Sequence, residues 1–284
     1  MSDADHDFLL DKIGEWSEEV VFRAEKDHMV AFAAATNDDL AAHARGEYAA
    51  PVYAVVPVFD AMARTTMEVV PEDLRMRILH GEQDMRFVRP IRAGDELRCR
   101  AKVIGIHGRS SGVVVTTYLE SLGSQGELVN EQYFTGFFRG GRLEGGRGEQ
   151  PPEHQFDEGL RERSADAKVE QTFDADQTFR YAEASGDTTP IHTDEEFAKS
   201  VGLPGIIIHG LCTMAFVSRA VIQNTCPQEP GRLKRLAVRF SAPARPGDSV
   251  TTQLWGIGDG RYAFETSTED GALVIKDGLA EVAG

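Results

Sequence analysis

The sequence has few cysteines and no long apolar run, and these shortages exclude several classes of protein. Its 284 residues include only Cys99, Cys212 and Cys226, without the Cys-x-x-Cys or Cys/His spacing of a metal site. A reduced compartment is therefore expected, and we predict a cytoplasmic protein. No apolar run approaches the roughly 20 residues of a membrane helix. The acidic start, MSDADHDFLL, is typical of neither a secretory signal nor a transit peptide.

Positive charge is also scarce in this chain. Thirty Lys and Arg stand against 46 Asp and Glu, which gives a formal net charge of −16. Because such a surface would repel phosphates and anionic lipids, we expect neither nucleic acid nor a membrane as the main partner. A local basic pocket for a small polyanion remains compatible with this charge.

The chain contains an internal repeat. The segment AFAAATNDDLAAH, which ends at His43, resembles RYAEASGDTTPIH, which ends at His192, and Asp38 then aligns with Asp187 at a spacing of 149 residues. Downstream, MRFVRPIRAGDEL resembles VRFSAPARPGDSV at a spacing of 153 residues. Two similar blocks in the same order indicate two copies of one domain.

We place the two copies at residues 12–140 and 166–284. Residues 141–165 are rich in Gly, Pro, Glu and Arg, so they are expected to form a linker that crosses the surface. One long helix and several antiparallel strands in each copy predict an α+β fold, with a sheet wrapped around the helix. The predicted helices are 28–35, with Asp27 at its start, 52–67, 179–184, with Asp174 or Asp176 at its start, and 210–224.

The stretch at residues 181–210, YAEASGDTTPIHTDEEFAKSVGLPGIIIHG, holds the candidate catalytic residues. Gly186 permits a sharp turn after the helix, and Pro190 is expected to hold the next loop extended. Asp187 and His192 lie on that loop, so a carboxylate and an imidazole can face one water molecule. Neutral histidine is a competent base near pH 7.

His209 and Gly210 mark the start of the long helix in the second copy. Free N–H groups at a helix start favour negative charge, so the Gly210 N–H is expected to donate to a carbonyl oxygen that becomes an enolate. His209 is expected to shape this helix start rather than to exchange protons.

The run SGD-x-x-P-I-H followed by H-G resembles the signature of the MaoC-like (R)-specific enoyl-CoA hydratases, also called type-2 enoyl-CoA hydratases. Larger members contain two fused hotdog folds with a degenerate first copy, and LHGEQDMRFVRPI resembles a strand of that copy. The resemblance covers the chain from about residue 15 to its end. It implies a double hotdog, with a degenerate copy at 12–140 and a catalytic copy at 166–284.

The same resemblance implies a reaction and its residues. Water would add reversibly to a trans-2-enoyl-CoA, with attack at C3 and a proton at C2, to give an (R)-3-hydroxyacyl-CoA. Asp187 and His192 would activate the water, and the Gly210 N–H would polarise the thioester carbonyl. The expected substrate-binding residues are Gly186, Thr189, Pro190 and His209.

Thr189 departs from the family pattern, in which Asn often stands two residues after the Asp. Threonine keeps a hydroxyl group but reaches less far. A non-catalytic acyl-CoA-binding paralogue therefore stays open as an alternative, as do a hotdog thioesterase and a dehydratase acting on acyl-carrier-protein substrates in fatty acid or polyketide synthesis. No metal or redox cofactor is implied beyond the coenzyme A thioester substrate, and a homodimer of double hotdogs is left open.

Asp38 and His43 keep the spacing of the candidate pair, yet the first copy lacks the His-Gly at its helix start. We therefore interpret them as a vestigial site. His80, in LHGEQ, is interpreted as structural.

Overall fold

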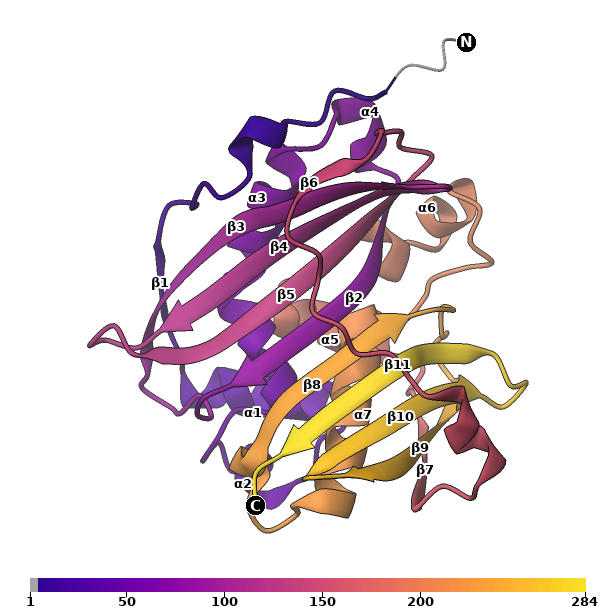
Figure 1. Cartoon of the computed structure of the whole chain (residues 1–284). Coiled ribbons are helices and arrows are strands. Elements are labelled where there is room, and N and C mark those ends of the chain that lie inside the picture. The colour runs from indigo at the N-terminus through magenta and orange to yellow at the C-terminus, as the bar shows by residue number, and fades with distance from the viewer. Residues whose placement is uncertain (1–4) are drawn as a thin grey trace.

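The computed structural model describes residues 5–284, which form one antiparallel sheet of 11 strands with helices against its inner face (Figure 1). Strands β2 and β8 pair at the middle of the sheet. Outward from them, the order is β5, β4, β3, β1 on one side and β11, β10, β9, β7 on the other. The two halves thus have equivalent topologies, as a double hotdog requires.

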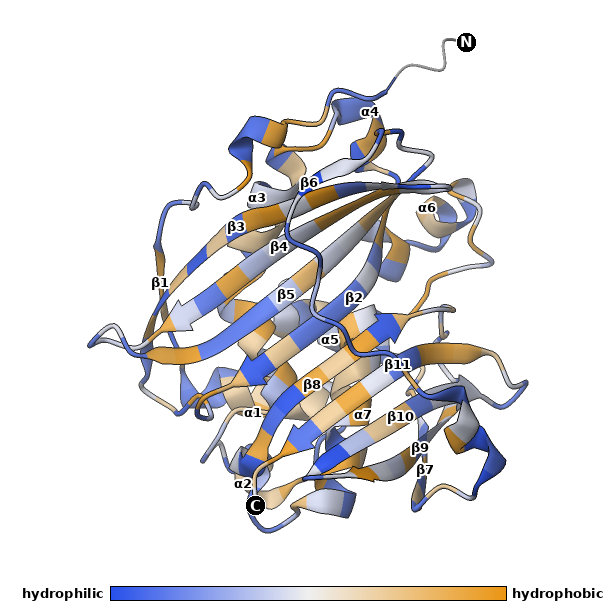
Figure 2. Cartoon of the chain, in the orientation of Figure 1, coloured by the Kyte–Doolittle hydropathy of each residue, from blue (hydrophilic) through white to orange (hydrophobic). Residues whose placement is uncertain are grey.

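The strands alternate between buried and exposed residues over much of their length, so hydrophobic and hydrophilic colours alternate along them (Figure 2). Asp259 and Gly260 join β9 to β10 with φ of 52° and 70°, the positive values that a two-residue hairpin turn needs. The strands are β1 (Val20–Arg23), β2 (Ile78–Phe87), β3 (Glu96–Arg109), β4 (Gly112–Leu122), β5 (Leu128–Arg139), β6 (Gly146–Gly148), β7 (Ala167–Thr172), β8 (Leu233–Phe240), β9 (Ser249–Gly258), β10 (Arg261–Thr268) and β11 (Leu273–Val282).

The central helices differ between the halves. In the second half, α7 (Gly210–Thr225) is one 16-residue helix, close to the prediction, and most of its side chains are buried. The single helix predicted at 52–67 is wrong. The chain there forms a 3₁₀ helix, η2 (Pro51–Val58), followed by α3 (Phe59–Glu68). Pro57 lies inside η2 and has no N–H to donate, which disfavours a continuous α-helix.

The helices at the start of each copy pack against one another. Phe32 of α1 (Lys26–Ala35) and Tyr181 of α5 (Gln177–Ser185) have ring centroids 5.7 Å apart in a core shared by both halves. Asp27 was a wrong cap prediction, since Glu25 precedes α1 and Asp27 lies inside it. Asp176 does precede α5, but its carboxylate accepts from Arg180 rather than capping the helix.

The remaining helical segments are short. They are η1 (Leu10–Lys12), α2 (Ala41–Ala44), α4 (Glu72–Arg75), η3 (Glu158–Glu162), η4 (Pro190–His192), α6 (Glu195–Ser200) and η5 (Pro230–Arg232). Within residues 5–284, no helix combines the length and apolar character needed to span a membrane. The cytoplasmic location stays a prediction.

The segment between the halves crosses the outer face of the sheet (Figure 1). Its strand β6 pairs with β3, and its His154 contacts both β11 and β2. The His154 ring donates from Nδ1 to the carbonyl of Asp277 (2.6 Å), and Nε2 lies 3.6 Å from the Glu82 carboxylate. The copy boundaries at 12–140 and 166–284 remain predictions.

Candidate active site

The predicted catalytic residues lie on the segment that connects α5 to α7. Gly186 ends α5 with φ of 81°, a left-handed value that favours glycine, so the sharp turn occurs where it was predicted. Pro190 does not extend the loop as expected. It begins η4, a position that suits proline because the first N–H groups of a helical turn have no partner within it.

Asp187 is half-buried and is oriented by Thr189. Its Oδ1 accepts from the backbone N–H of Thr189 (3.1 Å) and from the Thr189 hydroxyl (2.6 Å). Both contacts use the same oxygen, so Thr189 leaves the second carboxylate oxygen to other partners. Thr189 therefore has a structural task at this position, although it replaces the more usual Asn.

His192 is buried and held in one tautomer. Its Nδ1 donates to the carbonyl of Ile207 at 2.8 Å, which leaves a lone pair on Nε2 of the neutral ring. Burial lowers the pKa of His192, while the Ile207 carbonyl and the Asp187 charge oppose that shift. The ring is therefore neutral at pH 7 and available as a base.

His209 stacks on His192, with centroids 3.7 Å apart and planes at 23°. Its Nε2 donates to the backbone carbonyl of Asp187 (3.0 Å), and the Thr178 hydroxyl lies 3.1 Å from its Nδ1. Burial and the neighbouring His192 lower the pKa of His209 to about 3. A neutral ring with both nitrogens engaged fits a role in shaping the loop.

Asp187, His192 and His209 form the one acidic or histidine cluster of metal-ligand geometry among residues 5–284, with ligand atoms within 4.8 Å of one another. Both nitrogens of His209 and Nδ1 of His192 already have protein partners. The cluster therefore fits a water molecule between the Asp187 carboxylate and His192 Nε2 better than a metal ion.

Gly210 begins α7 directly after His209. A Cβ at this position would lie 3.1–3.3 Å from three atoms of the Phe240 ring, so a larger residue would require the ring or the backbone to shift by a few tenths of an ångström. N–H groups in the first turn of a helix have no partner within that helix. The first turn of α7 thus offers donors next to His209, which stacks on His192 of the candidate pair.

His80, interpreted as structural from the sequence, lies within range of the Asp187 charge, and Phe240 beside it was not identified from the sequence. His80 of β2 contacts the rings of Phe134 and Phe240 edge to face, each at a centroid distance of 4.7 Å. Burial lowers the pKa of His80 to about 4, and the charge of Asp187 opposes that shift. The motif LHGEQ marked this histidine, but its place beside the second copy depends on the pairing of β2 with β8.

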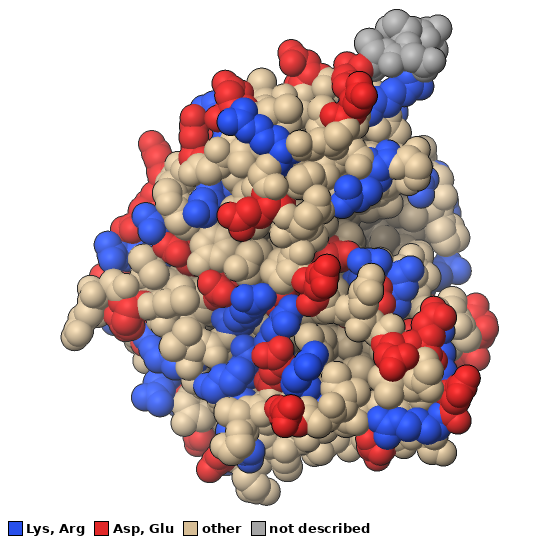
Figure 3. Space-filling model, viewed as in Figure 1, with Lys and Arg blue, Asp and Glu red and all other residues tan. Residues whose placement is uncertain are grey.

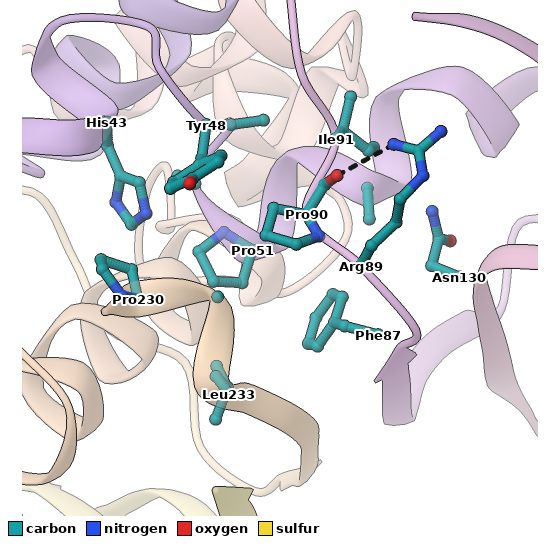
Figure 4. Close-up of a pocket in the computed structure, with 14 residues that line it drawn as sticks. His43, Tyr48, Pro51, Phe87, Arg89, Pro90, Ile91, Asn130, Pro230 and Leu233 are labelled. Atoms are coloured by element: carbon teal, nitrogen blue, oxygen red, sulfur yellow. Dashed lines mark hydrogen bonds between the residues drawn. The ribbon is translucent and has the colours of Figure 1, made fainter. Parts of the chain in front are cut away.

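The equivalent pair in the first copy is arranged differently. Asp38 and His43 contact directly, with Oδ2 and Nδ1 2.7 Å apart and side chains only 2% and 1% exposed. A direct contact leaves no room for a water between them, in keeping with a vestigial site. His43 borders a small pocket of about 30 Å³, lined largely by apolar groups including Tyr48 and Phe87 (Figure 4).

Two repeated hotdog sheets and an Asp/His pair in front of one central helix define a class, the hotdog hydratases and dehydratases. The N-terminal domain model of the MFE-2 hydratase 2 matches residues 43–140, and the MaoC like domain matches residues 158–277. The chain belongs to the MaoC-like family in its two-hotdog form, that of the type-2 enoyl-CoA hydratases.

Named relatives support this assignment. The chain is 30% identical over 207 residues to “Probable enoyl-CoA hydratase 2” of Dictyostelium discoideum, covering 72% of this chain and 70% of the relative. It is 32% identical over 255 residues to 3-hydroxyacyl-thioester dehydratase Y of Mycobacterium tuberculosis, covering 85% and 84%. The crystal structure of a MaoC-like dehydratase from Phytophthora capsici superposes with a TM-score of 0.84 at 27% identity, covering 98% of both chains. The predicted α+β double hotdog is confirmed.

Proposed function

We propose that the chain is a lyase that reversibly adds water to a trans-2-enoyl-CoA to give an (R)-3-hydroxyacyl-CoA. The main support is the unprotonated Nε2 of His192, which lies with the Asp187 carboxylate in front of the first turn of α7. Relatives named as an enoyl-CoA hydratase 2 and a 3-hydroxyacyl-thioester dehydratase support the same chemistry in its two directions.

In the proposed reaction, Asp187 and His192 hold one water molecule. His192 Nε2 takes a proton from the water as the oxygen forms a bond to C3, and the C2–C3 π electrons move to the thioester oxygen. The Gly210 N–H donates to that oxygen, and the enolate then regains its carbonyl as the proton passes from His192 to C2. General base catalysis contributes about 10²–10⁴-fold to such a step, and an oxyanion donor about 10²–10³-fold.

Two side chains and one backbone N–H of this chain supply every step, so the proposal invokes no metal or redox cofactor. A hollow lies on the outer face between the start of β2 and the end of β8, with Lys and Arg side chains at its border (Figure 3). Asp and Glu side chains lie there too (Figure 3), and the Lys and Arg groups among them suit the phosphates of coenzyme A. The overall charge of −16 disfavours a large acidic partner such as an acyl carrier protein. A homodimer of double hotdogs stays a prediction.

The test is hydration of crotonyl-CoA by the purified chain. The reaction is monitored by the loss of enoyl absorbance, and the configuration of the product is determined by chiral analysis. We expect (R)-3-hydroxybutyryl-CoA without release of free thiol. Thiol release would indicate a thioesterase, and binding without turnover would indicate a non-catalytic acyl-CoA-binding protein. Faster turnover of crotonyl-carrier protein than of crotonyl-CoA would indicate a carrier-protein dehydratase.

A further inference from the structure

A line of hydrogen-bonded side chains runs from the half-buried His80, beside the candidate active site, into the first half of the molecule. His80 Nε2 lies 3.1 Å from Gln83 Oε1, and Gln83 Nε2 donates to Gln132 Oε1 at 3.0 Å. Gln132 Nε2 donates in turn to the carbonyl of Ala54 at 2.6 Å. Both glutamines are fully buried, and buried amides are costly unless they are paired.

The donor and acceptor roles in these hydrogen bonds determine which ring nitrogen of His80 carries the proton. Gln83 uses its amide nitrogen on Gln132, so its carbonyl oxygen must accept from His80. The His80 ring therefore carries its proton on Nε2, and its plane is anchored from the first copy. Burial lowers its pKa to about 4, so the ring stays neutral at the pH where His192 acts as a base.

The His80 ring is linked to Gly210, the proposed oxyanion donor, through the side chain of Phe240. His80 packs edge to face on Phe240, and Phe240 lies directly against Gly210 at the start of α7. A shift of the Phe240 ring would therefore change how closely the first turn of α7 approaches the sheet.

The repeat shows that this polar line is not a requirement of the fold. At the spacing of 153 residues, His80 corresponds to Leu233 and Gln83 to Leu236, both buried and apolar. Leu233 borders the pocket beside the vestigial Asp38/His43 pair. The imidazole and its amide anchor thus occur on β2, which faces the candidate chemistry, and apolar residues occupy the matching places on β8.

We propose that His80 is a positioning residue, supplied by the first copy, that holds Phe240 so that the Gly210 N–H of the second copy meets the thioester oxygen. This inference rests on the proposed function, because the Gly210 N–H matters only for a carbonyl that gains charge. The degenerate copy, whose own pair is closed, thereby still contributes to the reaction.

The test uses the full chain with two single variants and their combination. His80→Gln keeps an amide donor for Gln83 but removes the ring, and Gln83→Leu removes the anchor and introduces the residue type found at position 236. Displaced catalytic groups cost up to about 10²-fold, so we expect kcat for crotonyl-CoA to fall about 10- to 100-fold in His80→Gln and about 3- to 10-fold in Gln83→Leu. KM should stay within about 3-fold, because the donor acts mainly on the transition state.

Because both substitutions break the same line, the double variant should be no slower than His80→Gln alone. The matched control is His107→Gln, which alters a buried histidine of β3 that bonds the Glu149 carbonyl and should leave kcat unchanged. If His80→Gln loses its native circular dichroism, Phe240→Leu takes its place and must show the same fall in kcat.

Full kcat in His80→Gln, or in the folded Phe240→Leu, would overturn the inference while leaving the proposed function in place. Multiplying losses in the double variant would also overturn it, as would a change confined to KM. A wild-type chain that does not hydrate crotonyl-CoA would end the proposed function and this inference together.

Discussion

The side chains of the candidate pair are held by different kinds of partner. His192 is oriented by a backbone carbonyl, that of Ile207, whereas Asp187 is oriented by the neighbouring Thr189. The loop backbone therefore sets the tautomer of the His192 imidazole, and the short side chain of Thr189 sets the orientation of the Asp187 carboxylate. Sequence spacing predicted the pairing of Asp187 with His192, but the stacking of His209 on His192 could not be read from spacing.

Conservative changes at the pair should abolish turnover. We expect Asp187→Asn and His192→Gln each to lower kcat for crotonyl-CoA by at least about 10³-fold, because the water loses its acceptor or its base. Circular dichroism should stay native. The matched controls are Asp38→Asn and His43→Gln, which should leave kcat almost unchanged because that pair is closed. Substantial turnover in both Asp187→Asn and His192→Gln would show that other groups are catalytic.

The histidine pKa values predict an acid limit for stability. Burial lowers the pKa of His80 to about 4 and that of His209 to about 3, below the ordinary value of about 6.5. The unfolded chain therefore binds more protons than the folded chain between about pH 6.5 and pH 3, so stability is full above that window and falls as the pH drops through it. Tm measured from pH 7.5 to pH 4 should fall, and the fall should be shallower in His80→Gln. An equal slope in both proteins would contradict the assignment to His80.

At the scale of elements, regular patterns were predicted well and interruptions were not. The long helix predicted at 210–224 forms α7. The broken helix of the first half was missed because Pro57 sits within an otherwise apolar run. Pro190 was expected in an extended loop, yet it also suits the first position of a short helical turn. From the local sequence alone, a proline is compatible with either an extended loop or the first position of a helical turn. The surrounding packing determines which of the two forms.

The start of α7 gives a prediction about size. In Gly210→Ala, the new Cβ meets the Phe240 ring at 3.1–3.3 Å, so either the ring or the helix start must shift. We expect kcat to fall about 10²-fold with little change in KM, since an oxyanion donor is displaced. A change confined to KM, or an unchanged kcat, would indicate that Gly210 does not serve as the donor.

At the scale of the whole molecule, the halves are joined by the pairing of β2 with β8. Asp84 of β2 is 3% exposed and accepts from two nitrogens of Arg235 on β8, at 3.1 and 2.8 Å. Breaking a buried ion pair leaves an uncompensated charge and costs about 3–5 kcal/mol. Glu281 also contacts Arg235 and will offset part of that loss.

We therefore expect Asp84→Asn to lower the free energy of unfolding by about 2–4 kcal/mol, measured by urea denaturation. The control is Glu47→Gln, whose partner Arg45 is 63% exposed and which should change stability by less than about 0.5 kcal/mol. Equal losses of unfolding free energy in the two variants would show that the Asp84–Arg235 ion pair between β2 and β8 does not hold the halves together.

The two-copy organisation was visible in the sequence as a repeat, but its consequence for the site was not. His80 lies more than 100 residues before Asp187, and it comes within range of the Asp187 charge because β2 pairs with β8. The pairing of β2 with β8 brings Phe240 against His80, and the pairing of β2 with β5 brings Phe134 against it. Contacts of this range depend on strand register across two copies, which one sequence does not determine.

A crystal structure of the Asp187→Asn chain with crotonyl-CoA bound would test the central claim most directly. The thioester oxygen should lie about 3 Å from the Gly210 nitrogen, and C3 should face a water molecule within hydrogen-bonding reach of His192 Nε2. A thioester bound away from α7, or a C3 atom turned from His192, would contradict the account.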